Sequence, residues 1–179
     1  DSIRSHGVTI DAIAEEMASG ISTGGDKIFR ITKDVAIERE FEITALRKIL
    51  VGSEIEKYNL VDTNNLIIYS TKQADIPQYP NIYKYLQQFE EQLSKKRETQ
   101  KGVLPWWCLH WPRYVNLFTE PKIIMRQTSD CIRCVYDEEG YFVLNSILVF
   151  KKNTEFFTYK YIATVLNSCV TDYMYKKLT

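Results

Sequence analysis

Two short motifs bring together side-chain types that can bind zinc. Cys108 and His110 are separated by one residue, and Cys131 and Cys134 by two. Together they offer four soft or borderline ligands, the number that closed structural zinc sites use. The Cys-x-His pair is an uncommon ligand spacing, however, and the other pair falls in a stretch typical of a strand rather than of a zinc knuckle. The pattern favours buried thiols, and we expect no bound metal.

A glycine-containing turn, Gly20-Ile-Ser-Thr-Gly-Gly-Asp26, has the composition of an anion-binding loop. Its glycines permit positive φ angles and a close approach of backbone N–H groups to phosphate, and Thr23 and Lys27 add side-chain donors. The turn lacks the Lys-Ser/Thr that would follow in a nucleotide-binding P-loop. A tight turn without a ligand explains the glycines equally well, so both interpretations remain open.

Basic side chains gather in one stretch of a chain whose formal net charge is zero. From Leu93 to Arg133 there are eight lysines and arginines against three acidic residues, a surplus of five positive charges. Such a surplus attracts phosphate, although an ordinary solvated surface is the alternative. The members of this stretch that we expect to contact DNA are Arg97, Arg113, Lys122 and Arg126. Arg97 ends a predicted helix and Lys122 begins a predicted strand, so local roles are also open to them.

Three tryptophans, Trp106, Trp107 and Trp111, lie within the basic stretch. Aromatic rings among cations stack on bases in nucleic-acid readers. Tryptophans beside prolines also anchor loops to a core, and this is the commoner role. We keep Trp107 as a candidate contact with DNA.

The patterns of self-contained enzymes are missing. There is no Gly-x-Gly-x-x-Gly, no Gly-Lys-Ser/Thr and no Gly-x-Ser-x-Gly, and only two histidines occur. No two prolines are adjacent, which excludes the Asn-Pro-Pro-aromatic box of amino-methyltransferases. We therefore expect no catalytic residue and no cofactor in this chain.

Helices and strands alternate irregularly in the expected secondary structure. Apolar spacing predicts helices near residues 10–17, over 42–50, from Pro80 to Leu93 and over 159–178, with Gly52 ending the second. Strands are expected over residues 27–31, 65–69, 122–126, 131–136 and 141–150, with a hairpin turn over 137–140. This order indicates an α+β fold, a mixed and mainly antiparallel sheet with flanking helices, in a single domain over residues 1–179.

Several blocks, taken in order, resemble the TaqI-like C-terminal specificity domain of type II adenine methyltransferases and restriction–modification enzymes. The blocks are Gly20-Ile-Ser-Thr-Gly-Gly-Asp-Lys-Ile-Phe29, Leu50-Val-Gly-Ser-Glu-Ile-Glu-Lys-Tyr58, Leu66-Ile-Ile-Tyr69, Tyr79-Pro80 with Tyr85-Leu86, Lys96-Arg97, Trp106-Trp107, Pro121-Lys-Ile-Ile124 and Leu166-Asn-Ser168. Each is short, but together they cover nearly the whole chain. Cys131-Ile-Arg-Cys134 departs from the arginine, isoleucine and small residues that the family has there.

The resemblance implies a sequence-specific double-stranded DNA recognition module that carries out no chemistry itself. It implies a catalytic methyltransferase domain in the same parent chain, with S-adenosylmethionine as that domain's cofactor and possible fusion to an endonuclease. The chain begins with Asp1, and we expect it to be part of a longer polypeptide. The alternative is a protein-interaction module of the type I specificity-subunit kind, with the helix from Pro80 and the C-terminal helix as contact surfaces.

The cellular setting follows from composition. The four cysteines occur without secretory marks, so we expect reduced thiols and a bacterial cytoplasmic location. No apolar run approaches the length of a membrane span, so we expect no membrane partner.

Overall fold

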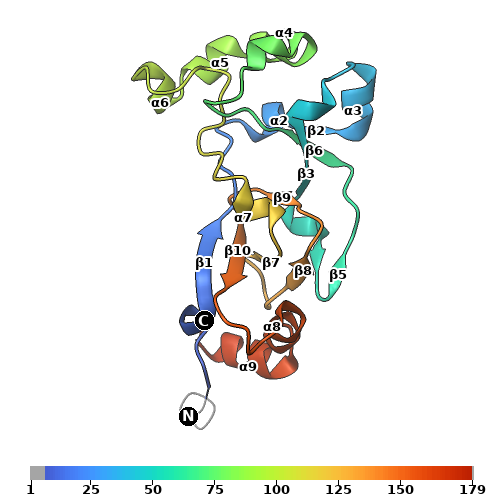
Figure 1. Ribbon diagram of the computed structural model, residues 1–179, viewed down its shortest axis with the longest axis vertical. Helices are drawn as coiled ribbons and strands as arrows, with labels where there is room; N and C mark the ends of the chain where they lie inside the picture. The colour runs from blue at the N-terminus through green and yellow to red at the C-terminus, as the bar shows by residue number, and fades with distance from the viewer. Residues whose placement is uncertain (1–6, 179) are drawn as a thin grey trace.

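Pairing between the two ends of the sequence builds the first of two four-stranded sheets. The computed structural model describes residues 7–178. This sheet is antiparallel throughout, and its strand order is β1, β10, β7, β8. Its strands are β1 (Ala14–Ser19), β10 (Ile147–Lys152), β7 (Lys122–Arg126) and β8 (Cys134–Asp137). The sheet occupies the lower half of the molecule in Figure 1.

The middle of the sequence forms the second sheet, with strand order β2, β6, β3, β9. Its strands are β2 (Arg30–Thr32), β6 (Asn65–Ile68), β3 (Leu46–Leu50) and β9 (Phe142–Val143). Only β3 and β9 pair in parallel. A separate small hairpin consists of β4 (Ile55–Glu56) and β5 (Asn59–Leu60).

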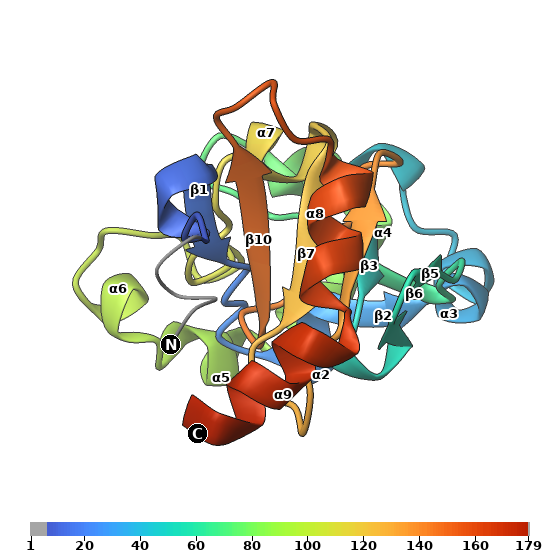
Figure 2. The same ribbon diagram turned by 90° about the horizontal axis from the view of Figure 1, so that it is seen from below.

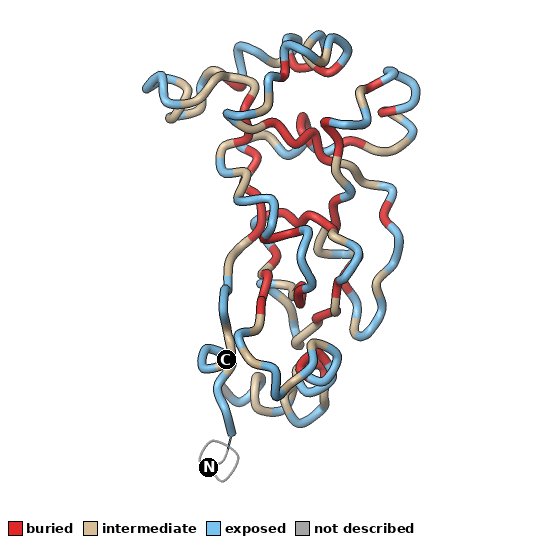
Figure 3. Tube along the Cα trace, in the orientation of Figure 1, coloured by how far each residue is buried: buried red, intermediate tan, exposed pale blue. Residues whose placement is uncertain are grey.

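One large apolar core joins the two sheets. It includes Ile124 and Val149 from the first sheet and Ile49, Ile67 and Phe142 from the second, all almost fully buried. Figure 3 shows these buried segments running through the centre of the molecule. The single core means that the position of one sheet fixes the position of the other.

Helices cover both ends of the pair of sheets. The upper end carries α2 (Asp26–Phe29), α3 (Lys33–Glu38), α4 (Pro80–Gln87), α5 (Glu90–Ser94) and α6 (Arg97–Gln100), and α7 (Asn116–Thr119) lies at mid-height (Figure 1). The 3-10 helices are η1 (Asp11–Ile13), η2 (Ile43–Ala45), η3 (Gly52–Glu54) and η4 (Ile76–Gln78). Pro80 lies at the first position of α4, where its missing N–H costs nothing. No helix within residues 7–178 has the length and apolarity needed to cross a bilayer.

The C-terminal helices close the lower end. In Figure 2 α8 (Tyr159–Leu166) crosses one face of the first sheet, where Ile162 and Ala163 form a second apolar cluster with Ile123 and Phe150. At Asn167 the chain turns into α9 (Cys169–Leu178). The buried Asn167 amide donates to the carbonyl of Cys134 (2.8 Å) and accepts from its N–H (3.0 Å).

The expected fold class is confirmed: the chain is α+β, with mainly antiparallel sheets and flanking helices. Strands β6 and β7 and the start of α4 lie where the sequence predicts them. The two expected long helices each break, the first between Gln87 and Glu90 and the second at Asn167.

Five local predictions are wrong. The single strand expected over residues 141–150 is divided into β9 (Phe142–Val143) in the second sheet and β10 (Ile147–Lys152) in the first. Residues 14–19 form strand β1, residues 46–50 form strand β3, and residues 26–29 form helix α2 ahead of the short strand β2. In the two misassigned helices, hydrogen bonding to partner strands overrides an apolar spacing that also suits a helix. The turn at 137–140 is no hairpin, because β8 pairs with β7 whereas β9 pairs with β3.

Candidate nucleic-acid interface

The glycine loop, Ser22–Asp26, packs against the junction of α5 and α6. Gly24 has φ +71°, and a Cβ built on it would lie 2.8 Å from the Lys96 side chain and 3.2 Å from Cβ of His110. Thr23 is buried; its hydroxyl donates to Asp26 and accepts from the N–H of Gly25 (2.9 Å). The Thr23 hydroxyl is therefore used within the loop and offers no donor to phosphate.

Lys96 holds the glycine loop and the following aromatic loop, residues 105–112, together. Its ammonium donates to the carbonyl of Trp106 (2.9 Å) and to that of Cys108, and it lies 5.4 Å from the ring centroid of Phe29. Burial lowers the pKa of Lys96 to about 8. Lys96 is thus a structural cation within the basic stretch, which the sequence pattern gives no means of recognising.

Two of the predicted DNA contacts, Lys27 and Arg97, are exposed next to this packed centre. Lys27 lies on α2, two residues after Gly25, and Arg97 begins α6 directly after Lys96. Neither side chain forms a hydrogen bond or an ion pair with the residues that the structure describes. Both charges are available to an anion.

The aromatic loop packs largely inward. Trp106 and Trp107 are half-buried, with ring centroids 5.8 Å and 6.0 Å from that of Tyr83. The hydroxyl of Ser70 donates to the Trp107 carbonyl at 2.6 Å. Trp107 therefore anchors the loop and presents only part of its ring to the surface. Trp111, in contrast, is 57% exposed.

Arg113 is half-buried and anchored on the other side of the glycine loop. Its guanidinium donates to the hydroxyl of Ser19 (2.6 Å) and to the carbonyl of Gly20 (3.4 Å). The same group lies 4.4 Å from the ring centroid of Trp111. The cation is partly committed to these neighbours.

The remaining two candidates lie elsewhere. Lys122 is fully buried; its ammonium forms an ion pair with Asp137 and donates to the carbonyl of Phe118. Burial lowers the pKa of Lys122. Arg126 is ion-paired with Glu56 (2.9 Å). The structure thus brings Thr23, Lys27, Arg97, Trp107 and Arg113 around one centre, but it does not bring Lys122 and Arg126 there.

The four candidate zinc ligands have separate partners. His110 Nδ1 lies 3.0 Å from a carboxylate oxygen of Glu98, and the Cys134 thiol is next to the carbonyl of Ala163. Burial raises the pKa of Cys134 to about 12, which disfavours the thiolate that zinc requires. Among residues 7–178 no three His, Cys, Asp or Glu side chains lie together in a way that could hold a metal.

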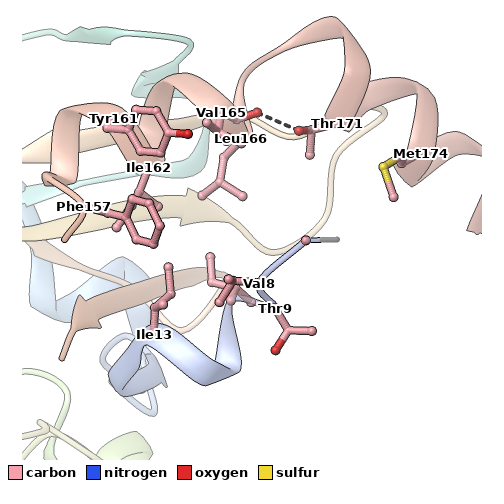
Figure 4. Close-up of a pocket in the computed structure, with 12 residues that line it drawn as sticks. Val8, Thr9, Ile13, Phe157, Tyr161, Ile162, Val165, Leu166, Thr171 and Met174 are labelled. Carbon is pink, nitrogen blue, oxygen red and sulfur yellow. Dashed lines mark hydrogen bonds between the residues drawn. The ribbon is translucent and has the colours of Figure 1, made fainter. Parts of the chain in front are cut away.

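A cavity of about 580 Å³ lies at the opposite end, between the N-terminal segment and α8–α9. Figure 4 shows its apolar lining, including Ile13, Phe157 and Leu166. The hydroxyl of Thr171 donates to the carbonyl of Val165 (2.6 Å) there. Among the described residues that line it, the polar side chains are the hydroxyls of Thr9, Tyr161 and Thr171, and the rest of the lining is apolar apart from Gly7.

Two comparisons relate this arrangement to known proteins. A solved structure of the Type IIL restriction–modification enzyme MmeI in complex with DNA matches 78% of this chain, with a TM-score of 0.58 and 15% sequence identity. At that identity the likeness is one of fold, and this chain spans only 19% of the length of that one. The model of the TaqI-like C-terminal specificity domain matches residues 47–179, which excludes only the first of the sequence blocks that resemble the family. The chain therefore belongs to the TaqI-like C-terminal specificity domain family.

Proposed function

We propose that this chain is the sequence-specific double-stranded DNA recognition module of an adenine-specific DNA methyltransferase or a fused type II restriction–modification enzyme. The observation that carries the proposal is the pair of exposed, unpartnered cations, Lys27 and Arg97, beside the glycine loop. Membership of a specificity-domain family supports the same function. Cations that lack internal partners are the ones that a polyanion can recruit without first breaking an ion pair.

In this proposal the two tasks of recognition are divided among neighbouring side chains. Lys27 and Arg97 bind backbone phosphates and set the register, whereas side chains of the aromatic loop read the groove. Trp107 and Arg113 hold that loop in place. The zero net charge fits a module whose companion domain supplies part of the phosphate contact.

The chemistry belongs to the companion methyltransferase domain, which would bind S-adenosylmethionine and the flipped adenine. Flipping a base costs a few kcal/mol. A module that grips the duplex on one side can offset part of this cost. The proposal places the protein in the cytoplasm with the DNA that it reads.

Salt-dependent binding tests the phosphate contacts. Lys27→Ala and Arg97→Ala should each weaken binding to cognate and random duplexes alike and lower the salt slope by about one. Lys177→Ala is the matched control, because Lys177 is an exposed cation on α9 at the other end of the molecule. If neither Lys27→Ala nor Arg97→Ala changes the slope, DNA meets another face and the proposed interface is wrong.

A second candidate function, helix-mediated assembly with a protein, is favoured by one observation. The C-terminal helices expose Tyr161 (55%), Val165 (44%), Val170 (52%) and Tyr173 (65%) near the apolar cavity. Exposed apolar surfaces of this kind often mark protein contacts. Sedimentation of the protein with and without Val170→Asp separates this function from DNA reading: a change in assembly with intact DNA binding would assign the helices to a protein partner.

A further inference from the structure

The turn at the end of the aromatic loop, residues 111–115, exposes several large apolar side chains. Tyr114 is 85% exposed, Trp111 57% and Val115 44%. The Tyr114 side chain makes no hydrogen bond or ring contact with the part of the chain that the structure describes. Leu117 and Phe118, the second and third residues of α7, are buried. Trp111, Tyr114 and Val115 are therefore exposed to solvent although the buried residues of α7 follow them closely in sequence.

This turn is held rigidly in a strained conformation. Arg113 has φ +61°, a left-handed backbone that residues with a Cβ adopt only at a cost in free energy. The hydroxyl of Tyr69 donates to the Arg113 carbonyl (2.9 Å), and the Arg113 guanidinium is fixed on Ser19. Trp111 and Ser22 exchange both of their backbone hydrogen bonds, at 2.8 and 3.1 Å. Such strain persists where the surroundings over-determine it, and it gathers at functional sites.

The turn is continuous with the proposed phosphate-binding surface. Trp111 pairs with Ser22, and the N–H of His110 donates to the carbonyl of Thr23, so the turn leaves directly from the edge of the glycine loop. Arg113 supplies positive charge within the turn, and the nearest acidic residue that follows in sequence, Glu120, is already paired with Lys151. Apolar side chains that adjoin the glycine loop and have no acidic residue among them suit a groove of a polyanion.

We propose that Tyr114 and Trp111 enter a groove of the duplex and contact base edges or base steps, with Arg113 as the residue that positions Trp111. This inference rests on the proposed function and assigns the apolar part of DNA contact within it. Base-reading proteins use apolar side chains against thymine methyl groups or as wedges between base steps. In this arrangement the Arg113 cation orients an aromatic ring instead of neutralising a phosphate.

The test separates apolar contact from charge contact. Binding is measured as a function of salt on randomised duplexes about three helical turns long, with the protein as its gene encodes it. Tyr114→Ala should weaken binding about tenfold without changing the salt slope, because an apolar contact releases no counterions. Arg113→Lys keeps the charge but loses the planar stack, and it should also weaken binding with an unchanged slope. Phe156→Ala is the control, since Phe156 is 95% exposed in the segment between β10 and α8.

Tryptophan fluorescence gives a second, direct measurement. Duplex should quench the emission of the protein, and Trp111→Phe should remove most of that change, because Trp106 and Trp107 are half-buried. Wild-type affinity in Tyr114→Ala together with unaltered quenching in Trp111→Phe would overturn the inference while leaving the phosphate contacts of Lys27 and Arg97 standing. A wild-type protein that binds no duplex at any salt concentration would instead overturn the proposed function itself.

Discussion

Lys122 shows that a basic side chain can make all of its polar contacts inside the protein. Its ammonium is shared between the Phe118 carbonyl and Asp137. The Asp137 carboxylate also accepts the backbone N–H groups of Glu139 (2.8 Å), Gly140 (3.2 Å) and Tyr141 (3.0 Å). The buried pair therefore ties strands β7 and β8 to the turn that redirects the chain into the second sheet.

Removing one partner of this pair should be costly. Lys122→Met is expected to lower the free energy of unfolding by about 3–5 kcal/mol, because it leaves a buried carboxylate without its cation. The double variant Lys122→Met/Asp137→Asn should be more stable than Lys122→Met alone, since the uncompensated charge is gone. Denaturant titration measures both. If the loss of unfolding free energy in the double variant equals the sum of the losses in Lys122→Met and Asp137→Asn, the two side chains are not coupled and the prediction is wrong.

Residue type and spacing identify the basic stretch, but they do not identify the partner of each cation. Lys27 and Arg97 are exposed as a phosphate contact requires, whereas Lys96 and Lys122, equally basic in the sequence, bind carbonyls and a carboxylate inside the molecule. Thr23 was expected to donate to phosphate and is instead saturated by its own loop. These differences arise from contacts between distant segments, which local spacing does not encode.

At the scale of elements, the junction of α8 and α9 fixes the C-terminal helices to the first sheet. The Asn167 amide forms two hydrogen bonds with the backbone of Cys134. The carbonyl of Asn167 accepts from Lys57 (3.0 Å), which also pairs with Asp172 at the start of α9. One polar side chain thereby sets the position at which one helix ends and the next begins.

Replacing Asn167 by the nearly isosteric aspartate should destabilise the protein. Asn167→Asp loses the donor to the Cys134 carbonyl and places a carboxylate against that oxygen, so we expect the free energy of unfolding to fall by about 2 kcal/mol. Asn116→Asp is a matched control, because Asn116 is exposed on α7. Thermal unfolding measures the difference between the two variants. Equal stability of Asn167→Asp and Asn116→Asp would show that the two hydrogen bonds between the Asn167 amide and Cys134 contribute little.

The elements that sequence patterns predict well are those with a local signature. Pro80 marks the start of α4, and the apolar run of residues 122–126 marks β7. Strands β1 and β3 were missed because the spacing of Ile10, Ile13 and Met17, and that of Leu46, Ile49 and Leu50, resembles a helix face and not the alternation of a strand. Only the partner strands, far away in sequence, decide between the two.

At the scale of the whole molecule, the two proposed phosphate contacts and the exposed apolar surface of the C-terminal helices lie at opposite ends (Figure 1). Lys27 and Arg97 are on α2 and α6 at the upper end, and the apolar cavity lies beside α8 and α9 at the lower end. In the proposed enzyme the upper end faces DNA and the lower end is free for another contact.

The chain by itself should be catalytically silent. We expect neither methyl transfer to DNA nor cleavage when S-adenosylmethionine and magnesium are supplied, because the proposed function assigns the chemistry to a companion methyltransferase domain. Radiolabelled methyl incorporation and plasmid cleavage measure the two activities, with the intact parent enzyme as the positive control. Methyl transfer or cleavage by the purified chain would contradict our proposal that a companion domain carries out the chemistry.

The pairing of β1 with β10 constrains how the chain folds as it is synthesised. Ala14 pairs with Lys152, so β1 has no partner strand in the first sheet until residue 152 has emerged from the ribosome. Closing so long a loop costs chain entropy and slows folding relative to local contacts. During this wait β1 offers unpaired N–H and C=O groups to other nascent chains. We expect the adjacent exposed carboxylates of Glu15 and Glu16 to oppose such pairing by repelling a second copy, as charged gatekeeper residues do on edge strands.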